Sequence, residues 1–205
     1  MKLPTAWFLP RDANVLALLS TQSRTVCDAI TVLIQWAHHD LALAQAVDRL
    51  RELLASEQQQ RRALNAAVRA SFSMPLEAED LFELAERLHE LATAAYTLVR
   101  EAQLSCTEPD HGLMVIIDAV AAASRILHQA LSRLPHADAA GISDRAADAL
   151  TAAEHGYRLA IADLENEQDL RRELRRRELY RRAEHLTGAT ARSLHRIWYA
   201  VCKTS

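Results

Sequence analysis

Apolar residues recur along most of this chain at alternating spacings of three and four. The pattern is clearest between residues 81 and 98, where no Gly or Pro interrupts it. Its members there are Leu81, Leu84, Leu88, Leu91, Ala95 and Leu98. This spacing places them on one face of an α-helix, as in helices that pack side by side like a coiled coil. Similar seams in five further segments predict six long helices.

Breaks in the pattern set the expected helix boundaries. The helices are expected at about residues 13–38, 41–71, 75–106, 108–134, from 139 or 144 to 164, and 170–201. Suitable N-caps precede four of them: Asp12, Thr107, Asp138 or Ser143, and Asp169. Pro75 suits the first position of the third helix, because its fixed φ fits a helix and its missing N–H costs nothing there.

The composition agrees with an all-α fold. Half of the 205 residues are hydrophobic but only 5% are aromatic, and the chain has 4 Gly and 5 Pro. No run of alternating β-branched residues predicts a strand. Short connections imply antiparallel neighbours. We therefore expect one domain over residues 1–205, an elongated bundle of two three-helix units that cover about residues 1–106 and 107–205.

Net charge and cysteine usage indicate which partners and which cellular compartment to expect. A net charge of −3 offers no general attraction for nucleic acid. Cys27, Cys106 and Cys202 are widely spaced, which is typical of small buried residues in a reducing compartment. The N-terminus does not resemble a signal peptide, and its apolar segment 7–10 is expected to pack against the bundle. No apolar run approaches the ~18 residues of a membrane span, so we expect a cytoplasmic protein.

Three motifs resemble a known family. They are Phe8-Leu9-Pro10-Arg11-Asp12, then Ser71-Phe72-Ser73-Met74-Pro75-Leu76-Glu77-Ala78-Glu79-Asp80-Leu81, and finally Glu178-Leu179-Tyr180-Arg181-Arg182-Ala183-Glu184. In order and spacing they are similar to the distant relatives of PhoU, the phosphate-uptake regulator, which are called phosphate transport regulators or Pit accessory proteins. The resemblance implies a PhoU-like helical bundle and an accessory role beside a low-affinity phosphate transporter.

The resemblance also directs attention to metal sites, because PhoU-type proteins carry Glu/Asp-x-x-x-Asp motifs that hold metal clusters on the bundle surface. The corresponding positions here are degraded. Within residues 56–61 only Glu57 is acidic, and residues 89–93, 151–155 and 184–188 each lack a complete carboxylate pair. The family's metal ligands therefore do not carry over as such.

Imidazole and carboxylate groups stand at three of the degraded motifs. These are His89 and Glu90, Glu154 and His155, and Glu184 and His185. One interpretation is a rewritten site for zinc or another transition metal. The other, which we favour, is ordinary exposed helix surface, since adjacent residues on a helix point about 100° apart.

Two charged features are open to more than one interpretation. Glu57 and Arg61 fall on the expected seam of the second helix. The Arg cation could replace a lost metal, or the seam could turn outward and leave a solvated i, i+4 ion pair. Arg171, Arg172, Arg175 and Arg176 begin the densest basic cluster and are candidate partner-binding residues. They could contact an acidic transporter loop or anionic lipid, or simply form a solvated helix face.

The remaining motifs do not indicate catalysis. The segment Glu86-x-x-His89 is a single copy of a motif that a di-iron bundle needs twice, and no phosphate loop or Ser-His-Asp set is present. We expect a non-enzymatic regulatory protein without a cofactor, which binds a membrane phosphate transporter or signalling protein peripherally. Homo-oligomerisation stays open. The alternatives are a metal-binding helical protein and a helical scaffold unrelated to phosphate.

Overall fold

The computed structural model describes residues 15–71, 74–136 and 138–204. Six α-helices account for most of them, and these residues contain no strand, so the predicted all-α class is confirmed. The helices are α1 Val15–Ala37, α2 Leu43–Ala70, α3 Ala78–Ser105, α4 His111–Leu131, α5 Asp138–Asp163 and α6 Leu170–Thr204. A short 3₁₀ helix, η2 Leu164–Asn166, connects α5 to α6.

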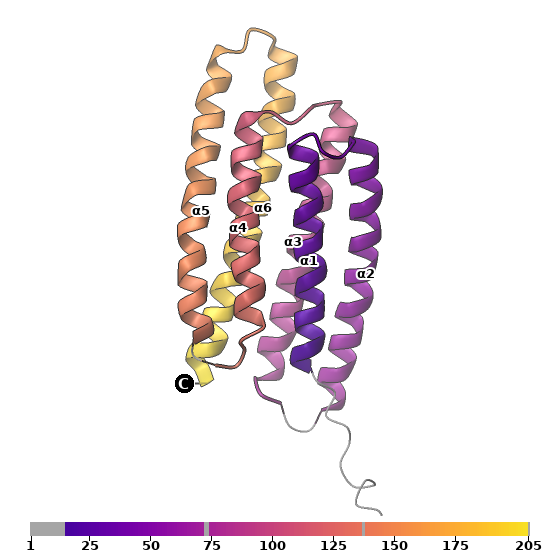
Figure 1. Ribbon diagram of the computed structural model, residues 1–205, viewed down its shortest axis with the longest axis vertical. Helices are drawn as coiled ribbons and strands as arrows, with labels where there is room; N and C mark the ends of the chain where they lie inside the picture. The colour runs from indigo at the N-terminus through magenta and orange to yellow at the C-terminus, as the bar shows by residue number, and fades with distance from the viewer. Residues whose placement is uncertain (1–14, 72–73, 137, 205) are drawn as a thin grey trace, which may run out of the picture.

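The helices form an elongated bundle of two antiparallel three-helix units (Figure 1). Helices α1, α2 and α3 pack on one another, as do α4, α5 and α6. The units meet through α1 against α4 and α3 against α6. Figure 1 shows α5, α6 and their connection extending beyond the other helices at the upper end.

The seams recognised in the sequence form the core. In α3, the residues Leu81, Leu84, Leu88, Leu91, Ala95 and Leu98 are all buried. Burying a large apolar side chain stabilises a fold by about 1.5–3 kcal/mol, so these seams supply most of the driving force for assembly. Alanines between the leucines, such as Ala85 and Ala102, let neighbouring helices approach closely.

Helix α4 lies in the middle of the bundle and is the most apolar of these elements. Among the described residues it is the one helix long and apolar enough, by length and composition, to cross a membrane. From the sequence we expected no segment apolar enough to span a membrane, and α4 shows that this expectation was wrong. Half of the apolar window is buried inside the bundle, as a core helix requires.

The start of α3 differs from the prediction. Pro75 lies in a bend before the helix, which begins at Ala78 with Glu77 at the N-cap position. The bend buries Leu76 in the core. The acidic first turn, Glu79 and Asp80, is confirmed.

The other predicted caps have mixed outcomes. Asp169 accepts the backbone N–H of Arg171 at 2.9 Å, so this cap is confirmed. Helix α4 is capped by Asp110, which accepts the N–H of Leu113, and not by Thr107. Ser143 lies inside α5. Asp12 and the apolar segment 7–10 lie outside the described residues.

Two glycines give a matched test of helix packing. A Cβ on Gly112 would lie 2.8 Å from Cβ of Ala160, whereas a Cβ on Gly141 would meet nothing within 4 Å. We expect Gly112→Ala to destabilise the protein by about 1–3 kcal/mol through overpacking. Gly141→Ala should instead stabilise it by up to about 1 kcal/mol through helix propensity. Urea unfolding of both variants measures the difference, and equal effects would contradict this account.

Candidate functional site

A buried carboxylate lies where three helices of the first unit meet. Glu57 of α2 is fully buried. Its Oε1 accepts a hydrogen bond from Nε2 of Gln22 at 2.7 Å, and its Oε2 lies 2.7 Å from Nδ1 of His89. Gln22 lies on α1 and His89 on α3, so the cluster connects all three helices. An ionised carboxylate only accepts hydrogen bonds, so Nδ1 of His89 is the donor.

Gln22 is fixed by further contacts and is itself fully buried. Its Nε2 also donates to the carbonyl oxygen of Ala85 at 2.9 Å. Its Oε1 is buried with no hydrogen-bond partner among the described residues. Sequence reasoning missed Gln22, although a signal was present: the residue stands three after Leu19 and four before Val26, both in the core of α1. A polar residue at a seam position indicates a buried partner.

Neither interpretation of Glu57 and Arg61 was correct. Glu57 is buried, so the pair is not solvated. Arg61 does not face the remaining motif carboxylates but forms an ion pair with Glu86 of α3, with Nη1 2.5 Å from Oε1. The counterpart of Glu57 is His89. Glu57 and Arg61 therefore do not pair with each other along α2; each pairs with a side chain of α3.

The structure does not bring the six metal candidates together. His89 contacts Glu57, while Glu90 forms ion pairs with Arg87 and with Arg192 of α6. The other four candidates lie on the surfaces of α5 and α6, where they are exposed: Glu154, His155, Glu184 and His185.

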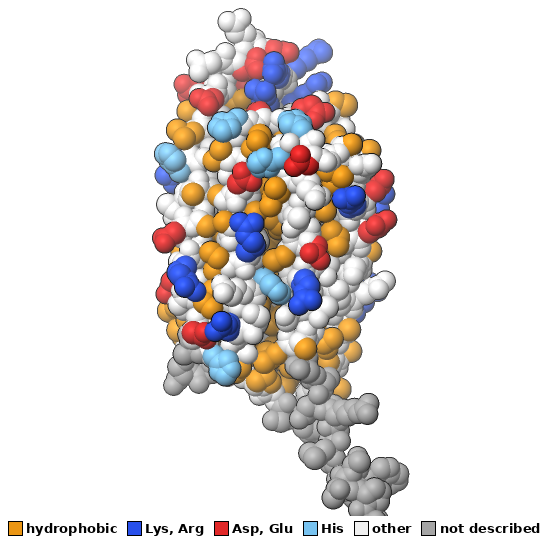
Figure 2. All heavy atoms as spheres, viewed as in Figure 1, with side chains coloured by type: hydrophobic (Ala, Val, Ile, Leu, Met, Phe, Trp, Pro, Cys, Tyr) orange, Lys and Arg blue, Asp and Glu red, His pale blue; other side chains and the backbone are white. Residues whose placement is uncertain are grey.

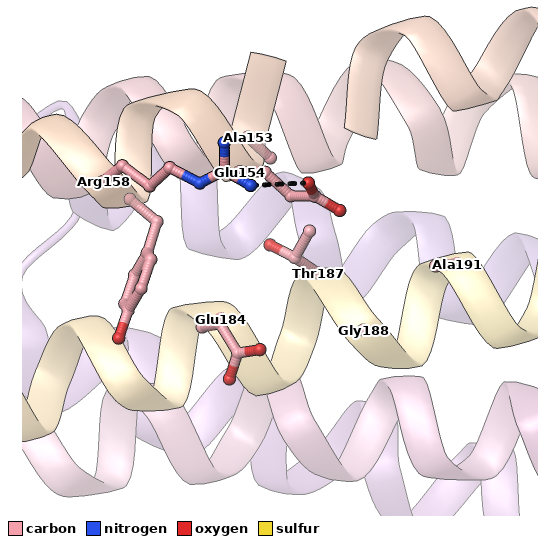
Figure 3. A pocket seen from close by; sticks show the side chains of 8 residues that line it. Ala153, Glu154, Arg158, Glu184, Thr187, Gly188 and Ala191 are labelled. Carbon is pink, nitrogen blue, oxygen red and sulfur yellow. Dashed lines mark ion pairs between the residues drawn. The ribbon is translucent and has the colours of Figure 1, made fainter. Parts of the chain in front are cut away.

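Two of these side chains do share a pocket. Glu154 and Glu184 line a pocket of about 260 Å³ between α5 and α6, where Glu154 forms an ion pair with Arg158 (Figure 3). Within the described part of the chain, no three His, Cys, Asp or Glu side chains lie close enough to hold one metal ion. The residues present therefore do not fit the metal clusters that the family resemblance suggested.

A second set of buried charges joins the two units and was also missed. Asp80 at the start of α3 is fully buried and lies 2.5 Å from Nη2 of Arg196 on α6. Lys203 of α6 contacts Glu77 and lies 3.9 Å from Asp80. Because an unpaired buried charge is costly, these contacts hold α6 against α3 in one register.

The candidate partner-binding arginines lie where α6 begins. Charged side chains of both signs crowd this upper end of the bundle (Figure 2). Arg172 forms an ion pair with Glu167, and Arg176 forms one with Asp110. No ion pair is recorded within the described residues for Arg171 or Arg175, and both are exposed.

These arginines line a pocket of about 430 Å³ together with the end of α3. The acidic residues Glu108 and Asp169 line it as well. The pocket is therefore of mixed charge and not a dedicated anion site. Of its four arginines, Arg171 and Arg175 form no ion pair within the described residues.

The cysteines differ from one another, which corrects the expectation that all three are buried. Cys106 and Cys202 are exposed, and Cys27 is partly buried against α4, where its Sγ lies 3.4 Å from the carbonyl oxygen of Ser124. Burial, with a smaller contribution from the nearby Asp28, raises the pKa of the Cys27 thiol to about 11.

This difference predicts selective alkylation. Because the thiolate is the nucleophile, iodoacetamide at pH 8 should modify Cys106 and Cys202 at least tenfold faster than Cys27. Mass spectrometry of the folded protein after short labelling should show two adducts. Three adducts formed at similar rates would contradict the assigned burial of Cys27.

The Glu57 cluster predicts a specific loss of stability. His89→Ala should destabilise the protein by about 1–3 kcal/mol, because it leaves a buried carboxylate without one of its two hydrogen-bond partners. The same substitution in a Glu57→Gln background should cost clearly less, as measured by a double-mutant cycle in urea. His155→Ala, at an exposed histidine, is the control and should change stability by no more than about 0.5 kcal/mol. Equal costs of His89→Ala in both backgrounds would show that the pair is not coupled.

Solved structures with the same fold identify the type of helical bundle that this chain forms. No family model and no curated protein matches the chain. Two crystal structures from Shewanella oneidensis MR-1 do resemble it. The first is described as a PhoU-like phosphate regulatory protein and has a TM-score of 0.72 at 16% identity, covering 93% of this chain and 100% of the other. The second, a PhoU-like protein, has a TM-score of 0.76 at 15% identity, covering 92% and 99%. The chain therefore has the fold of the PhoU-like proteins, as its three sequence motifs predicted.

Proposed function

We propose that this protein is a non-enzymatic regulator of inorganic phosphate transport. It acts in the cytoplasm by binding a membrane phosphate transporter, of the Pit type, or a signalling partner. The observation that carries the proposal is the match of its fold, over more than 90% of the chain, to a PhoU-like phosphate regulatory protein. The three sequence motifs support it independently of the structural likeness.

The described side chains favour binding over chemistry. The buried carboxylates Glu57 and Asp80 have partners within the bundle, so neither is available to a substrate. Tyr180 is likewise occupied, since its hydroxyl donates to Asp110 at 2.7 Å, and burial raises its pKa. These groups stabilise helix contacts rather than form a reactive site.

A direct test is deletion of the gene followed by measurement of phosphate uptake. Uptake at limiting and excess phosphate should change, and the wild-type gene should restore it. A co-purification experiment with the Pit-type transporter in mild detergent tests the physical contact. Unchanged uptake together with no co-purification would overturn the proposal.

Arg171 and Arg175 are the residues that we assign to the partner contact. Replacing both with Glu should weaken binding to the transporter about tenfold or more, mainly through slower association and with stronger effects at low salt. Stability should stay within about 0.5 kcal/mol of wild type, because both side chains are exposed.

The matched control makes the same charge change elsewhere. Arg62 and Arg145 are exposed arginines on α2 and α5, and no ion pair is recorded for either within the described residues. Arg62→Glu with Arg145→Glu should leave binding nearly unchanged, as measured by biolayer interferometry with detergent-solubilised transporter. Equal losses in the two double variants would show a net-charge effect and remove this assignment.

A further inference from the structure

Charged side chains of both signs lie without partners in the pocket at the start of α6. Arg171 and Arg175, one turn apart on α6, line this pocket of about 430 Å³ together with Glu108, which follows the end of α3. All three side chains are exposed, and no ion pair is recorded for any of them within the described residues. A molecule that enters the pocket can therefore pair with charges of either sign.

The other charged groups around this pocket are paired and hold its walls in place. Arg172 lies 3.3 Å from Glu167, which follows α5 and η2. Arg176 lies 3.4 Å from Asp110, whose carboxylate also accepts the hydroxyl of Tyr180 at 2.7 Å. Asp110 caps α4, so these contacts join the start of α4 to the start of α6. A surface that is fixed before binding loses less conformational entropy when a partner arrives.

Large apolar side chains are exposed around the same end of the bundle. Of seven such side chains among the described residues, five lie within five residues of the helix ends that meet here. They are Leu104 near the end of α3, Val115 near the start of α4, Leu159 near the end of α5, and Leu170 and Leu174 at the start of α6. Figure 1 shows these four helix ends at the upper end of the bundle. Apolar side chains that gather at one place mark an interaction surface more often than scattered ones do.

We propose that this upper end binds a protein segment that carries acidic, basic and apolar side chains together. The inference rests on the proposed function and specifies the chemistry of the partner, since the segment belongs to the transporter or signalling protein. A carboxylate of the segment pairs with Arg171 and Arg175, and a Lys or Arg of the segment pairs with Glu108. Apolar side chains surrounded by complementary charges are the usual composition of a protein–protein interface.

An anionic lipid surface fits these residues less well. Its headgroups are attracted by Arg171 and Arg175 but repelled by Glu108 and Asp169, which line the same pocket. Figure 1 also shows α5, α6 and their connection projecting beyond the end of α3. A flat bilayer would meet this projection before it reached the segment that follows α3. A protein segment, in contrast, can follow the step between the two levels.

Two charge reversals of opposite direction test the proposal on the full chain. Arg175→Glu and Glu108→Arg should each weaken binding to the detergent-solubilised transporter about threefold or more, because each places like charges against the segment. The exchange Arg175→Glu with Glu108→Arg has the net charge of the wild type and should bind no better than either single variant. Biolayer interferometry measures the affinities. Circular dichroism and urea midpoints should stay unchanged, because both side chains are exposed.

Glu52→Arg is the matched control for Glu108→Arg. It makes the same charge change at an exposed glutamate of α2 for which no ion pair is recorded in the described part of the chain. This variant should bind the transporter like the wild type, and an equal loss in both variants would show a net-charge effect and overturn the proposal.

The remaining outcomes separate this inference from the proposed function. If the transporter binds the wild type but Glu108→Arg leaves the affinity unchanged or raises it, the partner surface is purely anionic or lies elsewhere, and only this inference is overturned. If the wild type binds vesicles of phosphatidylserine and phosphatidylcholine through Arg175 and does not bind the transporter, the partner is a lipid surface. A wild type that binds neither the transporter nor a signalling protein refutes the proposed function, and this inference with it.

Discussion

The bundle depends on contacts between α3 and α6, because these two helices connect the three-helix units over much of their length. At one end of α3 the buried Asp80 requires Arg196, and farther along the helix Glu90 contacts Arg192. Apolar side chains attract without a preferred direction, so they specify the register of α6 less strictly than paired charges do. Charged pairs that are partly withdrawn from water make a shift of α6 along α3 expensive, since each displaced carboxylate would lose its partner. They therefore specify one register for the whole bundle.

The Glu57 cluster shows how a degraded motif can still be structurally important. The resemblance placed Glu57 at the position of a family metal ligand, with most of its acidic companions lost. In the structure Gln22 and His89 supply its hydrogen bonds from two other helices. A single buried carboxylate with such donors needs no metal ion for its stabilisation. Glu57 therefore has an electrostatic role in packing α1, α2 and α3 against one another.

Helix α6 carries both the proposed partner contact and much of the contact between the two units. Its first turns carry Arg171 and Arg175, which line a pocket with Cys106 just beyond the end of α3. Farther along the helix, Arg192 and Arg196 form ion pairs with Glu90 and Asp80 of α3. The arginines that we assign to a partner are therefore separate from those that hold the two units together.

The sequence by itself determined the number of helices, their apolar seams, the Asp169 cap and the likeness to PhoU-type proteins. These depend on local periodicity and capping, which neighbours along the chain decide. Only the tertiary structure decided that Glu57 pairs with His89, that Arg61 pairs with Glu86, and that the six candidate ligands do not converge. It also placed the start of α3 beyond Pro75, where the bend buries Leu76 in the core. Which faces of which helices meet depends on contacts between residues far apart in the chain, and no periodicity along a single helix contains that information.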